Sequence, residues 1–116
     1  MPKADELPIF THWMQFLEWL LPTTEKFPKR VRFTFADRIN NLALDIVEDL
    51  VEARYSRNKQ PLLKRINLRL EKLRILLRLC HRLKYLSHDG YEHAMRGLNE
   101  VGRMVGGWIK QQEEPS

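Results

Sequence analysis

The segment from Gln60 to Leu86 carries two apolar stripes at helical spacing, and this pattern limits the folds open to the chain. At about 100° per residue, its apolar residues fall on two nearly opposite faces of one long helix. The main face contains Leu63, Ile66, Leu70, Leu73, Leu77 and Cys80. It is widened on one side by Leu62, Leu76 and Leu83. The second stripe contains Leu68, Ile75, Leu79 and Leu86. A surface helix of a lone bundle needs only one apolar face, so the second stripe predicts contact with another subunit.

The polar residues of the same segment are almost all basic. Between Lys59 and Lys84, nine lysine and arginine residues stand against Glu71 alone, whereas the whole chain of 116 residues has a formal net charge of +5. Such asymmetry indicates an anionic partner such as nucleic acid; the alternative is a solvated basic face. The candidate nucleic-acid contacts, which lie within roughly a quarter-turn of one another, are Lys64, Arg74, Arg78 and Arg82.

The chain reads as four amphipathic helices, with no strand pattern. We expect them at about Ile9–Glu25, from Thr34 to about Tyr55, over Gln60–Leu86 and at about Tyr91–Lys110. Short connections between long amphipathic helices imply antiparallel neighbours. The sequence therefore predicts an all-α, up-down-up-down four-helix bundle, in which residues 1–116 form a single domain.

Several local expectations follow from the helical pattern. Pro22 is expected to kink the first helix or end its regular part, the segment Arg30–Phe33 to be extended, and Thr34 to cap the second helix. Four glycines in the last helix suggest close approach of another backbone, or fraying after Gly106. The second helix also has a stripe opposite its main face. Its members Leu44 and Val51 join Leu68, Ile75, Leu79 and Leu86 as the predicted oligomer interface.

Signals for catalysis are weak. Asp89 and His93 could share a metal, but no obvious third ligand is present, and Asp89 is instead expected to cap the last helix. The sequence has no phosphate-cradling glycine loop, nucleophile elbow or cysteine pair, and the lone Cys80 is expected to be a buried thiol. We therefore predict no catalytic residue, metal or cofactor. A small bundle enzyme acting on an anionic metabolite is the alternative, and it would need a pocket joining Arg74 to acidic residues of the second helix.

Aromatic rings could stack bases if they are exposed, and Tyr55 and Tyr85 are the more plausible exposed rings. No apolar run approaches the roughly 20 residues of a membrane span, and the N-terminus lacks the pattern of a signal peptide. We therefore expect a cytoplasmic protein without a membrane partner.

Several segments, taken in order, resemble the Avd family, the accessory variability determinants of diversity-generating retroelements. They are Phe27-Pro28-Lys29 with Arg32-Phe33-Thr34 and Arg38-Ile39, Ala53-Arg54-Tyr55, Leu70-Glu71-Lys72-Leu73-Arg74 with Leu76-Leu77-Arg78-Leu79, and Leu98-Asn99-Glu100 with 102–110, which includes Gly106-Gly107-Trp108. The four-helix proteins encoded in intervening sequences of bacterial ribosomal RNA genes share the bundle. The Phe-Pro-Lys start and the strongly basic third helix favour Avd over that scaffold-like sister group.

The resemblance implies a four-helix bundle that assembles as a ring-like homopentamer. It also implies a non-catalytic role beside a reverse transcriptase and a template RNA, in making the mutated complementary DNA that diversifies a target gene. The expected partners are therefore the reverse transcriptase, RNA or DNA, and further copies of the chain. A scaffold that binds only protein is a further alternative.

Overall fold

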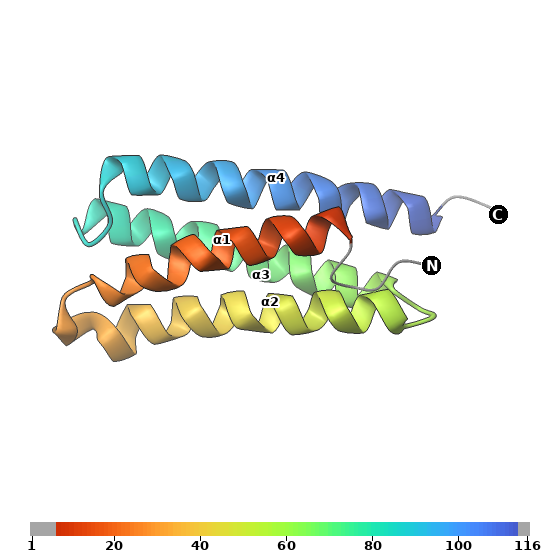
Figure 1. The fold of residues 1–116 in the computed structure, drawn as a ribbon, viewed down its shortest axis with the longest axis horizontal. Helices are drawn as coiled ribbons and strands as arrows, with labels where there is room; N and C mark the ends of the chain where they lie inside the picture. The colour runs from red at the N-terminus through yellow and green to blue at the C-terminus, as the bar shows by residue number, and fades with distance from the viewer. Residues whose placement is uncertain (1–6, 114–116) are drawn as a thin grey trace.

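The computed structural model describes residues 7–113, which form four long helices and no strand (Figure 1). The helices are α1 (Pro8–Glu25), α2 (Asp37–Tyr55), α3 (Gln60–Arg82) and α4 (His88–Glu113). Helices α1 and α3 each pack against α2 and α4, so the chain order runs around the bundle. The all-α class predicted from the sequence is confirmed.

The bundle is a rod of 50 × 20 × 20 Å. The α1–α2 and α3–α4 turns lie together at one end, at the left of Figure 1. The α2–α3 turn lies at the other end, together with the start of α1 and the end of α4. Each pair of consecutive helices is therefore antiparallel, as their short connections require.

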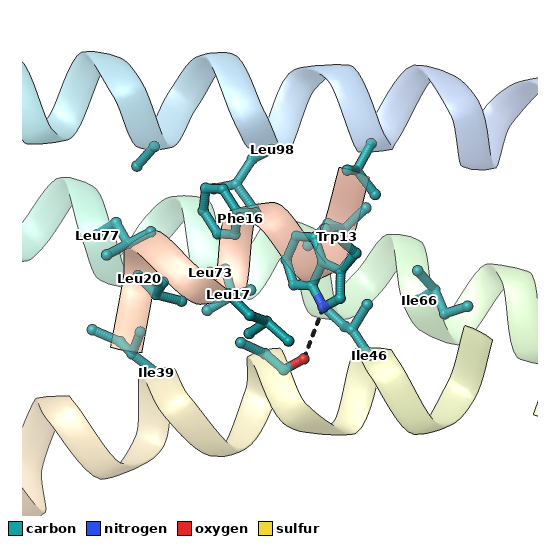
Figure 2. Close-up of a cluster of buried hydrophobic side chains, with 14 of the residues drawn as sticks. Trp13, Phe16, Leu17, Leu20, Ile39, Ile46, Ile66, Leu73, Leu77 and Leu98 are labelled. Atoms are coloured by element: carbon teal, nitrogen blue, oxygen red, sulfur yellow. Dashed lines mark hydrogen bonds between the residues drawn. The ribbon is translucent and has the colours of Figure 1, made fainter. Parts of the chain in front are cut away.

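The core contains the main apolar face of α3, as its spacing predicts. Its six residues are all fully buried: Leu63, Ile66, Leu70, Leu73, Leu77 and Cys80. Opposite them lies Trp13 of α1, whose ring stacks on Phe16 with centroids 5.0 Å apart. The indole Nε1 of Trp13 donates a hydrogen bond to the carbonyl oxygen of Ala43 at 2.9 Å (Figure 2). This bond satisfies the ring's one polar atom and ties α1 to α2.

Proline and glycine affect the helices less than expected. Pro22 does not end α1, which continues to Glu25. A Cβ at Gly97 would lie 2.5 Å from Cδ1 of Phe16, so glycine here lets α4 approach α1. Gly106 and Gly107 face open space, and α4 runs past them to Glu113. The expectation of fraying after Gly106 is therefore wrong.

The corner between α1 and α2 is helical, which corrects the expectation of an extended segment at Arg30–Phe33. A 3₁₀ turn, η2 (Lys29–Val31), leads into a π-helical turn, η3 (Arg32–Ala36), which continues directly into α2. Ala36 already has helical angles and no side chain caps α2, so the expected cap at Thr34 is also wrong. A continuous helical backbone leaves no free N-terminus there for a hydroxyl to cap.

Helix α3 ends one turn earlier than expected because Lys84 adopts a left-handed conformation, with φ of 68°. Tyr85 N–H bonds to the carbonyl oxygen of Cys80 at 2.8 Å, and Lys84 N–H to that of His81 at 3.0 Å. These two bonds make a Schellman motif. The reversal returns Leu86 to the core, where it is only 4 % exposed. The prediction that Leu86 belongs to an outward-facing stripe is therefore wrong.

Candidate nucleic-acid and subunit interface

The arginines in the first half of α3 face α2, where they surround a buried carboxylate. Asp49 is 5 % exposed. Its Oδ1 lies 3.0 Å from Nη2 of Arg65, and its Oδ2 accepts a hydrogen bond from Nη1 of Arg69. The hydrogen bond and the charge of Asp49 raise the pKa of Arg65. A buried carboxylate needs such partners, so these two arginines belong to the internal structure of the bundle.

Lys59 is also occupied within the bundle, at the junction of α2 and α3. Its Nζ donates to the carbonyl oxygens of Ala53 at 2.9 Å and Ser56 at 2.6 Å. The last carbonyls of a helix lack partners within the helix, and a cation there also stabilises the helix dipole. Lys59 therefore caps the C-terminal end of α2.

Arg74, one of the candidate nucleic-acid contacts, points toward α4. Its Nε donates to Oδ1 of Asn99 at 3.2 Å and its Nη2 to the carbonyl oxygen of Leu98 at 3.3 Å. Its Nη1 lies 3.1 Å from Oε2 of Glu71. A Cβ at Gly102 would lie 2.8 Å from Nη2, so the glycine leaves room for the guanidinium. The structure thus places Arg74 between two helices, and we do not retain it as a nucleic-acid contact.

The orientation of Arg74 also bears on the enzyme alternative. That alternative requires Arg74 to converge with acidic residues of α2. In the structure Arg74 binds α4 and Glu71, whereas Asp45 and Asp49 of α2 pair with Arg69. The pocket that the enzyme alternative needs is not formed by these residues.

Lys64, Arg78 and Arg82 remain on the outside of α3, and all three are exposed. None of the ion pairs within residues 7–113 involves them. At 100° per residue they lie within about 40° of one another around the helix axis, and they extend over roughly 27 Å along it. We call these three residues the basic strip.

Exposed apolar residues accompany the basic strip. The five that remain of the predicted interface are Leu68, Ile75, Leu79, Leu44 and Val51, which are 56, 46, 42, 41 and 37 % exposed. Ile75 also lines a groove of about 570 Å³ between α2 and α3, together with Leu42 and Leu76. The outward position of these five residues agrees with the helical spacing. We call them the outer apolar residues.

The aromatic predictions are only partly correct. Tyr55 is exposed, at 68 %. Tyr85 instead lies among Phe27, Phe35 and Arg30, with ring centroids 6.4 and 5.8 Å from those of the two phenylalanines. The most exposed large hydrophobic residue in the described chain is Phe33, at 79 %. Sequence reasoning missed it because its position on the α1–α2 corner depends on the π-helical turn.

The remaining polar candidates have structural contacts. Ser87, rather than Asp89, caps α4, because its Oγ accepts a hydrogen bond from Gly90 N–H at 3.0 Å. His93 packs against Trp19, with ring centroids 4.3 Å apart. Within residues 7–113, no three His, Cys, Asp or Glu side chains form a group that could hold a metal ion. Over the same residues, no helix is long and apolar enough to cross a membrane.

Together these features define a small four-helix bundle protein with basic and apolar residues side by side on one outer helix. The model of the family described as bAvd-like matches residues 9–112, almost the whole chain. The protein belongs to the bAvd-like family, which consists of accessory proteins. The resemblance to Avd drawn from the sequence is therefore confirmed. Comparison with curated proteins gives no match.

Proposed function

We propose that this protein is the accessory protein of a diversity-generating retroelement. It acts in the cytoplasm as a homopentamer, without catalysing a reaction itself, and binds the reverse transcriptase together with template RNA or complementary DNA. Of the sequence-predicted contacts, Lys64, Arg78 and Arg82 bind the nucleic acid. Family membership supports the accessory role, and the pentamer is the assembly that the resemblance implies.

The main support for the proposal is that the basic residues of α3 fall into two groups, one bonded inside the bundle and one exposed to solvent. Arg65, Arg69 and Arg74 neutralise or bond to groups within the bundle, whereas the basic strip faces outward without an ion pair in residues 7–113. Arginine forks suit phosphate oxygens. Repetition of the strip in each subunit lets a long strand bind several copies at once.

The positions of the outer apolar residues support a ring. On α2, Leu44 and Val51 lie about 140° and 160° from Asp49 around the helix axis, and Asp49 faces α3. The α2 pair therefore lies on a different side of the bundle from Leu68, Ile75 and Leu79. An interface that joins two unlike faces is heterologous, and such interfaces close into rings when the rotation permits.

The test of nucleic-acid binding changes Arg78 and Arg82 together to Gln. Removing two outward charges from each subunit should weaken binding of a single-stranded RNA by at least about tenfold and reduce the dependence of affinity on salt. Fluorescence anisotropy with a labelled RNA measures both quantities. The matched control is Arg96→Gln with Arg103→Gln, which removes the same charge from exposed positions on α4.

Mass measurement by light scattering accompanies the titration, because the basic strip lies beside the outer apolar residues. The double variant should keep the wild-type mass, and Ile75→Glu with Leu79→Glu should reduce it or cause aggregation. If the control variant lost as much RNA affinity as the Arg78→Gln/Arg82→Gln variant, binding would depend on the net charge of the protein and not on the basic strip. Unchanged affinity for both RNA and the reverse transcriptase would remove the basic strip from the function, and a wild-type mass of one chain would exclude the ring.

A further inference from the structure

The corner between α1 and α2 presents an aromatic ring to solvent on a well-anchored turn. Phe33 is 79 % exposed, whereas Val31 and Ala36 on either side are buried. Phe35 turns inward against Tyr85. The ring thus stands on a fixed backbone, so little conformational freedom is lost when something packs against it. Phe33 lies on the π-helical turn η3, and such turns are frequent at functional sites.

The same corner is strongly basic. No acidic residue stands between Glu25 and Asp37, and the exposed side chains of this stretch include four cations: Lys26, Lys29, Arg30 and Arg32. The guanidinium of Arg30 lies 5.8 Å from the ring centroid of Tyr85. This contact joins the corner to the α3–α4 turn at the same end of the rod (Figure 1). There Arg82 and Lys84 add two more exposed cations.

We propose that Phe33 and the surrounding cations form a binding site for single-stranded nucleic acid, in which a base stacks on the Phe33 ring and Lys29, Arg30 and Arg32 bind the flanking phosphates. The proposal rests on the proposed function, to which it adds the strand state of the ligand and a second contact region. An exposed ring among cations matches a ligand that combines planar apolar faces with negative charge, and unpaired strands have both. A duplex conceals the faces of its bases except at its ends.

The site continues one end of the basic strip. Arg82 is the last residue of α3 and belongs to both the strip and the basic end of the rod. A strand stacked on Phe33 can therefore pass Arg82 and continue along α3. Stacking accepts any base, so the site predicts weak sequence preference together with a strong preference for single strands over duplexes.

The experiment uses the full chain and measures its affinity for a labelled single-stranded RNA by fluorescence anisotropy. The RNA has about 12 nucleotides, which is within the range that single-strand binding modules cover. Phe33→Ala should weaken binding about tenfold, whereas Phe33→Trp should keep or strengthen it. An abasic strand of the same length should bind wild type and Phe33→Ala equally. The control is Tyr55→Ala, which removes an exposed ring at the opposite end of the rod.

The outcomes separate this site from the proposed function. Full affinity in Phe33→Ala, with loss in Arg78→Gln/Arg82→Gln, would overturn the stacking site and leave the proposed function intact. Absence of RNA binding by wild type would refute the nucleic-acid function itself. Loss of mass or of reverse transcriptase binding by Phe33→Ala, with RNA affinity unchanged, would assign the ring to a protein contact and overturn the site. Quenching of 2-aminopurine in the bound strand, lost only in Phe33→Ala, would support it.

Discussion

The two halves of α3 are both rich in leucine and arginine, yet their arginines, apart from Arg74, perform different physical tasks. In the first half, Arg65 and Arg69 turn toward α2 and surround Asp49. In the second half, Arg78 and Arg82 face solvent. The difference arises from the neighbouring helix, since α2 offers carboxylates to the first half of α3. The basic residues of a helix therefore indicate an external partner only when they are not already paired with groups inside the protein.

The largest effect that would test this comparison is expected at Asp49. Asp49→Ala removes the acceptor of two charged hydrogen bonds, from Arg65 and Arg69, and should lower the free energy of unfolding by about 3 kcal/mol. Urea denaturation measures the loss. Glu48→Ala, at the exposed neighbouring position of the same helix, should cost less than about 0.5 kcal/mol. Equal and small effects of the two substitutions would mean that Asp49 does not organise the first half of α3.

The two halves can be compared directly by replacing one arginine in each half with glutamine. Arg69→Gln loses the charged hydrogen bond to Asp49 and should reduce the free energy of unfolding by about 1.5 kcal/mol. Arg78→Gln should change it by less than about 0.5 kcal/mol. The same denaturant titration gives both values. A loss from Arg78→Gln as large as that from Arg69→Gln would break the comparison, because it would give Arg78 a structural partner.

The smallest effect concerns the inner face of the second half, where Cys80 lies. Burial raises the pKa of the Cys80 thiol from 9.0 to about 11. Between these values the unfolded chain has lost the thiol proton and the folded chain retains it, so stability falls as pH rises from 9 to 11. At pH 10 the loss is about 1 kcal/mol. Cys80→Ala should lack this part of the pH dependence, which urea midpoints at pH 8 and pH 10 measure in both proteins.

Much of the fold could be predicted because helical periodicity determines which residues share a face. The spacing of leucines placed Leu63, Leu70 and Leu77 in the core and Leu68 and Leu79 outside. The end of α3 could not be predicted, because a left-handed turn at Lys84 has no glycine to mark it. The sequence does not predict the helical corner at residues 29–36 for a similar reason, since Pro28 indicates a break without specifying the turn that follows.

The candidate site was predictable only in part, since the angular position of a residue on one helix does not reveal the neighbouring helix. Arg74 and Arg78 look alike in the sequence, and only the packing of α4 shows that Arg74 reaches Asn99 and Leu98. The apolar spacing continues the third helix one turn too far, to Leu86, and therefore predicts an exposed Leu86 where the structure buries it. The exposure of Phe33 depends on the π-helical turn, which has no recognisable sequence pattern.

The arrangement of the turns has a practical consequence for measurements on this protein. The start of α1 and the end of α4 lie at the end of the rod opposite to the α1–α2 corner (Figure 1), and the rod is 50 Å long. A dye or surface tether attached near the start of α1 or the end of α4 would therefore leave the end of the rod that bears Phe33 and Arg82 free. The distance between the two ends also falls in the range that energy transfer between dyes resolves, so a donor near Glu113 and an acceptor on a bound strand would report which end the strand reaches.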